Sequence, residues 1–443
     1  MVWIGISLDV ATELVVLDRR NLNAHRYITN ILEPVVVPFV GQDFIYMQNN
    51  GRPHIAKLKR FFILSFALNI TVFKIVGVYR SNKYTHLLKL FSYMLYTFAM
   101  LPTIIFGFIQ LFCNSNFLYN DLVGIVMFFL SPKLFFVVKN GDKVKRCIHY
   151  FDNELVTSMN DGHDEIIDKC VKSCRRNSLV YFISCNICSS AWFIKSFFRE
   201  DISELPLDVW NPFKENDRSI FYYSLYVSLS LGVYYLGFMC SAMEPLIAGL
   251  IHHGATQLRV LKRNLQYLDE YVENKIVKMN YKCTSEIRSR LIYDRIKECV
   301  LHYDLILNYT VDLESCFSGA MVSQFVESIT ALGVCCLQIS QVKTYNVDFY
   351  ILLFDLFVIL FQVCFYCYYG TLLMEEHNSL TSSIYMSKWY DYTPQSKKAL
   401  LILMERCKRP INITAGKVVE VSLETFILIL KRSYSLLAVL KSQ

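Results

Sequence analysis

The sequence predicts an all-α membrane protein with seven transmembrane helices, a cytosolic N-terminus and an extracellular C-terminus. The first observation is composition: hydrophobic residues make up 54% of the 443 residues, and charged residues only 19%, whereas a soluble domain carries about 25%. The second is a set of long apolar segments, and the third is the uneven distribution of lysine and arginine between them. No basic residue precedes the short apolar patch at the N-terminus, so we expect the first span, rather than a cleaved signal peptide, to direct insertion.

Each predicted span meets the requirement for about 20 apolar residues across the hydrocarbon core. The seven spans are residues 87–112, 117–138, 179–198, 220–243, 317–339, 349–374 and 417–440. An eighth apolar segment, residues 61–79, contains Asn69 and Lys74. Because a lysine near the centre of a membrane helix costs a few kcal/mol, we predict an amphipathic or re-entrant helix here, within a cytosolic N-terminal segment at residues 1–86.

The distribution of basic residues predicts the orientation of the chain. The loops at residues 139–178 and 244–316 are rich in lysine and arginine, whereas loop 113–116 has none and loop 340–348 has only Lys343. Cytosolic loops carry such an excess, which places the N-terminus inside. The net charge of +7 follows from these loops and implies no nucleic-acid partner. The orientation is the reverse of that of a G-protein-coupled receptor, and the Asp-Arg-Tyr and Asn-Pro-x-x-Tyr motifs of that class are absent.

Apolar residues recur every three or four positions over residues 246–271 and 285–312. This is the pattern of an amphipathic helix. We therefore predict that the fourth, fifth and sixth helices continue into the cytosol; helices lying on the membrane surface are the alternative. The predicted organisation is a ligand-binding part with the first four spans at residues 87–243, cytosolic extensions at 244–316, the fifth and sixth spans at 317–374, an anchor helix at 380–407 and a pore-lining helix at 417–440.

The last span carries an ordered polar stripe. At 100° per residue, one face of the helix holds Ser422, Thr425, Ile429, Ser433, Leu436 and Leu440. Hydroxyl groups can replace part of the hydration of a passing cation, and leucines can close a path by excluding water. We predict a pore lined by Ser433, with a gate at Leu436, Leu437 and Leu440. The alternative is helix packing, in which hydroxyls bond between membrane helices. How Lys431 and Arg432 are accommodated stays open.

The sequence lacks the motifs of an enzyme. There is no glycine-rich phosphate loop and no nucleophile elbow. His252-His253 and Glu375-Glu376-His377 lack the second motif that a catalytic metal requires, and we interpret them as solvated faces. The cysteine pairs 185/188 and 364/367 have metal-like spacing, but they lie in apolar spans, where packing is the simpler interpretation. We predict no catalytic activity, no metal and no cofactor.

Several stretches of the chain resemble insect odorant receptors. The similarity is strongest over residues 387–440. It includes Ser387-Lys-Trp-Tyr-Asp391, Arg409-Pro410, Thr414-Ala-Gly416-Lys417, Ser422-Leu-Glu-Thr-Phe426 and Lys431-Arg-Ser-Tyr-Ser-Leu436. Leu205-Pro-Leu-Asp-Val-Trp-Asn-Pro-Phe213 and Phe73-Lys-Ile-Val-Gly77 resemble the family more diffusely. The C-terminal segment resembles that of the ligand-tuned receptors of this family and lacks the Thr-Tyr…Gln-Phe pattern of gustatory receptors. The chain also lacks the long cytosolic insertion of the coreceptor.

The resemblance implies an odorant-binding subunit of a ligand-gated, non-selective cation channel. Such a subunit assembles with the odorant receptor coreceptor into a heterotetramer in the plasma membrane of olfactory sensory neurons, without a G protein. Its partners are therefore the coreceptor, a small volatile ligand and membrane lipid. The alternatives are a gustatory-receptor-like homomeric channel and a metabotropic seven-helix receptor, which would have an extracellular N-terminus and a glycan on Asn69. A transporter is the weaker membrane alternative.

The resemblance also places the ligand site in the outer halves of the second, third, fourth and sixth helices. The residues there are Phe117, Tyr119, Val123, Met127, Cys188, Ser189, Trp192, Tyr222, Tyr226, Tyr350, Phe354 and Phe357. Several recur at helical spacing, so each set is expected to face one cavity. An aromatic wall with a few polar groups suits a small, volatile, mostly apolar molecule. Taken singly, each of these residues is equally explained by ordinary packing.

Overall fold

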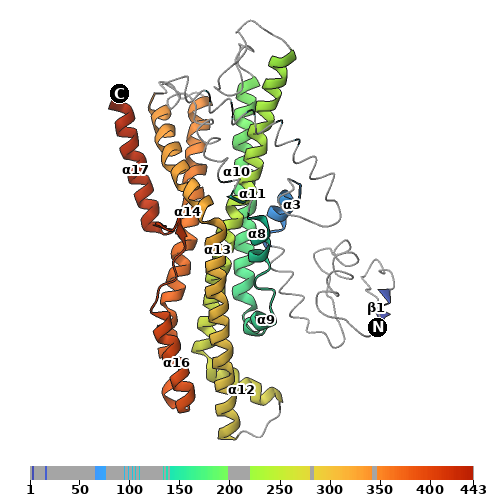
Figure 1. Cartoon of the computed structure of the whole chain (residues 1–443), viewed down its shortest axis with the longest axis vertical. Coiled ribbons are helices and arrows are strands. Elements are labelled where there is room, and N and C mark those ends of the chain that lie inside the picture. Colours follow the sequence, from blue (N-terminus) through green and yellow to red (C-terminus); the bar gives the residue numbers. More distant parts are fainter. Residues whose placement is uncertain are drawn as a thin grey trace. The chain divides into compact units, whose positions relative to one another are not determined.

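Long helices dominate the computed structural model (Figure 1). The structure describes residues 65–75, 140–197, 220–279, 284–341 and 347–442, together with a few isolated positions. The helices are α3 (Ala67–Ile75), α8 (Gly141–Ile148), α9 (Glu154–Asn160), α10 (Asp164–Phe197), α11 (Ile220–Gln266), α12 (Leu268–Met279), α13 (Ser285–Gln341), α14 (Val347–Asn378), α15 (Leu380–Met386), the 3-10 helix η4 (Trp389–Asp391), α16 (Pro394–Cys407) and α17 (Leu423–Ser442).

Two short antiparallel strand pairs complete the described elements. In the unit formed by Met1–Leu58, β1 (Val2–Trp3) pairs with β2 (Val15–Val16). In the larger unit, Lys59–Gln443, β3 (Thr414–Ala415) pairs with β4 (Val419–Glu420). The first two predicted spans, residues 87–112 and 117–138, fall almost wholly outside the described residues.

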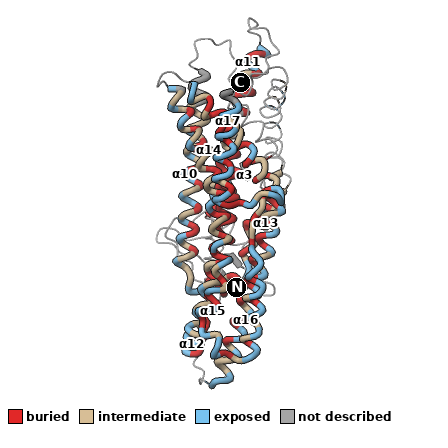
Figure 2. The backbone as a smooth tube through the Cα atoms, turned by 90° about the vertical axis from the view of Figure 1, so that its left-hand side faces the viewer, coloured by how far each residue is buried: buried red, intermediate tan, exposed pale blue. Residues whose placement is uncertain are grey.

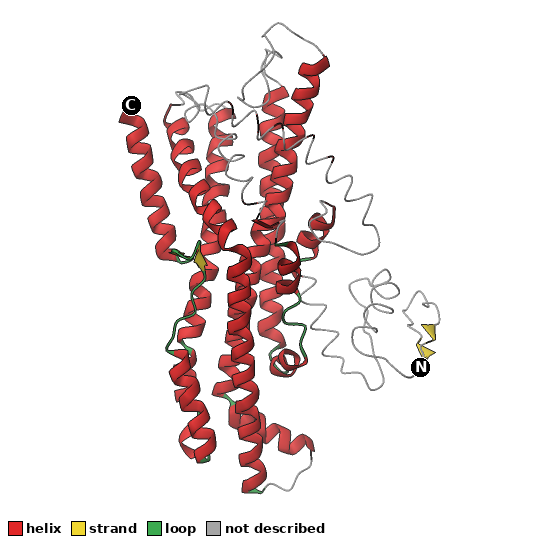
Figure 3. Cartoon of the chain, viewed as in Figure 1, coloured by secondary structure: helices red, strands yellow, loops and turns green. Residues whose placement is uncertain are grey.

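The long helices pack side by side. Helix α11 contacts α10, α13 and α14, and α13 also contacts α14 and α17 (Figures 1 and 3). Helix α13 has 57 residues and α11 has 47, which at 1.5 Å per residue correspond to about 85 and about 70 Å. The hydrocarbon core is only about 30 Å thick. Both helices are therefore far longer than a single crossing requires.

Three of the described helices are long and apolar enough to cross a membrane: Ile220–Gln266, Ser285–Gln341 and Phe349–Met386. They include the predicted fourth, fifth and sixth spans. Helices α12, α15 and α16 lie at the end of the larger unit that holds the polar halves of α11 and α13 (Figure 1). Helix α17 packs on the apolar half of α13. The amphipathic stretch 285–312 is thus part of α13. The stretch 246–271 belongs to α11 up to Gln266, and its last residues begin α12.

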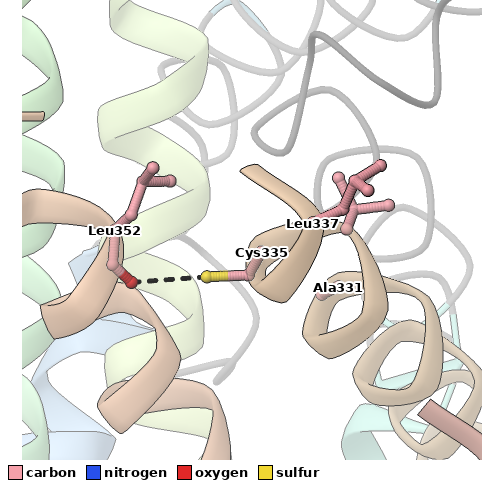
Figure 4. Close-up of a cluster of buried hydrophobic side chains, with 5 residues drawn as sticks. Ala331, Cys335, Leu337 and Leu352 are labelled. Atoms are coloured by element: carbon pink, nitrogen blue, oxygen red, sulfur yellow. Dashed lines mark hydrogen bonds between the residues drawn. The ribbon is translucent and has the colours of Figure 1, made fainter. Parts of the chain in front are cut away.

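Buried residues concentrate where the long helices face one another (Figure 2). One cluster joins α13 to the beginning of α14 and consists of Ala331, Val334, Cys335, Leu337 and Leu352. The Cys335 thiol donates a hydrogen bond to the carbonyl oxygen of Leu352 at 3.3 Å (Figure 4). The cluster fixes these two helices close together next to α17.

Helix α17 begins at Leu423, six residues later than predicted. Residues 414–422, the β3–β4 segment, instead form the strand pair, and Gly416 and Lys417 adopt φ values of 63° and 60° there. This left-handed conformation suits a tight turn and is incompatible with a helix. Ser422 Oγ then accepts a hydrogen bond from the backbone N–H of Thr425 at 3.4 Å, so Ser422 caps the helix.

Helix α3 corresponds to the predicted non-spanning segment at residues 61–79. Phe66 and Phe73 are fully buried, and the helix packs on α11. The amide of Asn69 is also buried and donates to the carbonyl oxygen of Ala242 at 2.6 Å. Asn69 therefore anchors α3 to α11.

The end built by α11, α13, α15 and α16 contains a buried polar network, where solvated faces were expected. Glu376 accepts hydrogen bonds from Arg259 at 2.7 Å and Lys262 at 3.5 Å. His377 is fully buried and lies 3.0 Å from the Tyr303 hydroxyl. The expectation for Glu376 and His377 was wrong because neighbouring helices cover both sides of α14 at this point.

His302 precedes Tyr303 on α13, 15 residues before the predicted start of the fifth span. Its ring nitrogen Nε2 lies 3.1 Å from the Gln257 side-chain oxygen, and the side chain has no exposed surface. Burial, and next the positive charge of Arg295, lower the pKa of His302 to about 3. The imidazole is therefore neutral in the folded protein at physiological pH.

Candidate ligand pocket and pore helix

The contact between α10 and α14 is the best-defined part of the predicted ligand region. Tyr181 and Cys185, one helical turn apart on α10, form a buried cluster with Val358 of α14. Phe354 and Phe361 of α14 pack against this cluster. Residues three or four apart face the same side of a helix, which explains why these side chains meet.

A carboxylate lies at this contact. Asp355 of α14 is buried, and the Cys188 thiol of α10 donates to its Oδ1 at 2.6 Å. A buried acid within an apolar membrane helix is expensive and commonly has a functional role. Asp355 was not among the predicted site residues. The signal was present, because Asp355 is an isolated charge in the apolar segment 349–374.

Among the described pocket candidates, those on α10 and α11 and Phe354 are buried or half-buried, whereas the other two on α14 are exposed. Cys188 and Phe354 lie at the α10–α14 contact, and Ser189 is half-buried on α10. On α11, Tyr222 is buried and Tyr226 half-buried. Tyr350 and Phe357 face outward, each 60% exposed in this single chain. Phe117, Tyr119, Val123, Met127 and the Trp192 side chain lie outside the described residues.

A small cavity lies between α10, α11 and α14, away from the predicted pocket. Its lining residues are Cys174, Asn177, Pro245, Ala248, Gly249, Phe365 and Tyr369. The Tyr369 hydroxyl accepts a hydrogen bond from the Asn177 amide at 2.7 Å. Because Pro245 and its neighbours follow the predicted fourth span, this cavity belongs to the predicted cytosolic side.

A buried ion pair connects the predicted second span to three helices. Lys133 is fully buried and paired with Glu244 of α11, and it also donates to Gln324 of α13. Glu244 accepts a hydrogen bond from the Tyr366 hydroxyl of α14. The Gln362 amide donates to Gln324 Oε1 at 2.7 Å. Ionisable groups in membrane helices are paired in this way because an isolated charge there is costly.

The polar stripe of α17 faces the interior of the chain. Ser433 is buried, and its hydroxyl donates to the Ile429 carbonyl oxygen at 2.9 Å. Leu436 and Leu437 are half-buried and pack against the cluster that joins α13 to α14. A Cβ on Gly333 of α13 would lie 2.9 Å from Leu436, so the two helices approach closely here.

The opposite face of α17 is exposed in this single chain. Its exposed apolar residues are Ile427, Leu428, Leu430, Tyr434 and Val439. Lys431 and Arg432 are exposed as well, which places both charges outside the packed interior. The side chain of Leu440 lies outside the described residues. An apolar membrane-length face of this kind is suited to lipid or to another subunit.

The sequence matches the model of the 7tm Odorant receptor family over residues 114–434. Odorant receptor Or1 of Anopheles gambiae is 24% identical over 264 residues, which cover 57% of this chain and 63% of that protein. Odorant receptor 42b of Drosophila melanogaster is 28% identical over 152 residues, covering 34% of this chain and 37% of that protein. The matched parts thus span less than two thirds of either relative.

The structure resembles solved insect receptors. The insect olfactory receptor OR5 from Machilis hrabei, solved in complex with eugenol, aligns with a TM-score of 0.71 at 15% identity. The alignment covers 88% of this chain and 100% of that one. A second structure of OR5 aligns with a TM-score of 0.69, over 87% of this chain. At this identity the likeness establishes the fold.

Proposed function

Because the chain belongs to the 7tm odorant receptor family, we propose that it is the odorant-binding subunit of a ligand-gated, non-selective cation channel. The observation that carries the proposal is the family match over residues 114–434, together with a fold shared with an insect olfactory receptor. The relatives are odorant receptors and not enzymes, which fits a receptor without catalytic activity. The family and the apolar helices make the chain a membrane protein.

The ligand in this proposal is a small, mostly apolar volatile. One structural relative is described in complex with eugenol. In this chain the aromatic side chains at the α10–α14 contact offer apolar surface, and burying it contributes about 25 cal/mol per Å². Asp355 adds an acceptor that orients a ligand hydroxyl or amine, because a carboxylate accepts several hydrogen bonds at once.

Ser433, Leu436, Leu437 and Leu440 of α17 are the proposed pore and gate residues. In the single chain Ser433 is buried, and Leu436 and Leu437 pack against α13 and α14. In this proposal α17 therefore moves relative to these helices when the path opens, and its exposed apolar face meets neighbouring subunits. The proposed partner is the odorant receptor coreceptor, and the proposed location is the plasma membrane of olfactory sensory neurons. The N-terminus is proposed to be cytosolic and the C-terminus extracellular, with α11, α13, α14, α15 and α16 forming a cytosolic anchor.

Voltage-clamp recording of cells expressing this chain, with and without an odorant receptor coreceptor, tests the proposal. A panel of small volatiles should evoke rapid cation currents only when both subunits are present. Currents from this chain alone would replace the heteromeric channel with the gustatory-receptor-like homomeric one. Responses that require a G protein would reject the channel and support the metabotropic alternative.

A further inference from the structure

Two cysteines and two histidines meet between α10 and α11. Cys170 and Cys174 are four residues apart, so their thiols share one face of α10. His252 and His253 are consecutive on α11. The Cys174 sulfur lies 3.6 Å from Nδ1 of His252, and the Cys170 sulfur lies 3.8 Å from Nδ1 of His253. All four side chains are buried, where the sequence pattern alone predicted a solvated histidine pair.

Three of these donors converge on one point. The ligand atoms of Cys170, Cys174 and His252 all lie within 4.8 Å of one another. In a tetrahedral zinc site, with Zn–S about 2.3 Å and Zn–N about 2.0 Å, a sulfur and a nitrogen ligand are about 3.5 Å apart. The observed sulfur–nitrogen distances of 3.6 and 3.8 Å are close to this edge length. Two separate thiol–imidazole hydrogen bonds would not require a third donor at the same point.

The surroundings hold these donors in place. The His252 ring stacks on Tyr369 of α14, with centroids 4.5 Å apart. The His253 ring meets the edge of Phe66, which precedes α3, at 5.1 Å. Fixed ring orientations favour metal binding, because ligands that are held in place lose little freedom when the ion arrives. Helices α10, α11 and α14 and the residue before α3 thus surround the cluster.

The chemistry of the donors selects the metal. A thiolate, rather than a thiol, binds a metal ion. Two cysteine sulfurs and an imidazole favour zinc over calcium or magnesium, which prefer oxygen ligands.

We propose that Cys170, Cys174 and His252 hold a structural zinc ion that fastens α10 to α11 on the proposed cytosolic side, with His253, whose Nδ1 lies 3.8 Å from the Cys170 sulfur, beside the fourth position. The site is independent of the channel function and of the odorant pocket. The bound ion would hold α10 and α11, whose outer halves carry the proposed pocket residues, in a fixed relative position.

Cobalt binding by the purified full-length chain in detergent, carrying a tag without histidine, tests this site. After treatment with a chelator, Co²⁺ is added and the absorption spectrum is followed. We expect about one Co²⁺ per chain, with thiolate-to-metal charge-transfer bands and the intense visible bands of tetrahedral cobalt. Cys174→Ser should weaken binding by more than about 100-fold, since even the loss of an outer partner of a metal ligand costs about 10- to 100-fold.

Cys299→Ser is the matched control, because Cys299 is a buried cysteine of α13 outside the cluster. It should bind Co²⁺ like the wild type. If Cys174→Ser does not fold, His252→Gln and the shift in the wild type's unfolding temperature on adding Zn²⁺ give the same information, because a ligand that binds only the folded state raises that temperature. Wild-type protein without charge-transfer bands and without a zinc-dependent shift would overturn the proposal.

Discussion

Phe354 and Phe357 differ in their surroundings although both were predicted pocket residues. Phe354 packs on the Tyr181–Cys185–Val358 cluster, whereas Phe357 is 60% exposed. We predict that Phe354→Leu shifts the half-maximal concentration of the best agonist by about tenfold, because changing one apolar contact in a pocket alters binding by about 1–3 kcal/mol. Phe357→Leu is the matched control and should shift it less than about twofold. Concentration–response curves of ligand-evoked current measure both variants, and equal shifts would contradict this placement of the pocket.

The buried pair of Lys133 and Glu244 gives a prediction about stability. Lys133→Met should destabilise the fold by about 3–5 kcal/mol, because it leaves the Glu244 charge buried without its partner. The double variant Lys133→Met with Glu244→Gln removes both charges and should recover much of the lost stability. Fluorescence-detected size-exclusion chromatography after heating compares the two. A double variant no more stable than the single one would show that the charge pairing is not the cause.

Several individual residues could not be predicted from the sequence. His252 and His253 were interpreted as solvated, yet α11 is buried all around at this level, from Leu246 to Leu258, because α3, α10, α13 and α14 surround it. Periodicity reports which side of a helix is apolar, and it fails where a helix is covered on every side. Asp355 stands out in the sequence as an isolated charge, but its contact with Cys188, 167 residues away in the sequence, could not be predicted.

At the scale of elements, the helical pattern predicted the long helices better than their ends. Helix α11 joins the fourth apolar run to most of the amphipathic stretch that follows it, and α13 joins the fifth apolar run to the amphipathic stretch that precedes it. The beginning of α17 was predicted six residues early, because hydropathy alone does not distinguish the apolar residues at β4, such as Val418 and Val419, from the first turn of a helix. Gly416 and the capping residue Ser422 were the local signals of the true boundary.

The close contact between α14 and the β3–β4 segment predicts that Gly370 of α14 does not tolerate a larger side chain. A Cβ on Gly370 would run into the carbonyl oxygen of Val421. Gly370→Ala should therefore destabilise the protein by about 1–3 kcal/mol, the usual cost of overpacking. Gly254→Ala is the comparison. Its Cβ would lie 3.3 Å from both the end of Leu373 and the ring of Tyr309, a much smaller overlap than at Gly370, and alanine has the higher helix propensity. Thermal unfolding in detergent measures both, and a tolerated Gly370→Ala would mean that the segment can move away from α14.

The buried, neutral His302 in the proposed cytosolic anchor leads to a predicted pH dependence of stability. The folded-state pKa of His302 is about 3, against an ordinary value of 6.5. Below pH 6.5 the unfolded chain binds a proton that the folded chain does not, so stability falls as the pH drops from 6.5 towards 3. The loss at this one site reaches about 2 kcal/mol by pH 5. The unfolding temperature of His302→Gln should depend less on pH in this range, and an unchanged dependence would contradict the assignment.

The positions of Leu437 and Leu428 on different faces of α17 lead to a prediction about gate substitutions. Leu437→Ala should raise ligand-independent current by roughly an order of magnitude, because losing apolar surface lowers the barrier to wetting by one or two kcal/mol. Leu428→Ala is the control, an exposed leucine two and a half turns earlier on the helix. Recordings without ligand compare them. Equal basal currents in both variants would assign Leu437 to packing against α13 instead of to a gate.

At the scale of the whole molecule, the proposed orientation rests on the distribution of basic residues, and the burial of Asn69 makes a glycan there unfavourable. The Asn69 amide nitrogen, where a glycan would be attached, donates a hydrogen bond inside the fold. We predict that deglycosylation leaves the mobility of the chain unchanged. An epitope at the C-terminus should be stained on intact cells and one at the N-terminus only after permeabilisation. The reverse staining pattern would invert the topology.

The central claim is that the chain forms part of the channel itself. Recording from outside-out patches excised from cells that express this chain with the coreceptor, without nucleotides in the pipette, tests it most directly. Openings evoked by an active volatile within milliseconds, and persisting without GTP, are the predicted result. Whole-cell responses that vanish on excision, and return only when GTP and cytosol are supplied, would contradict the account.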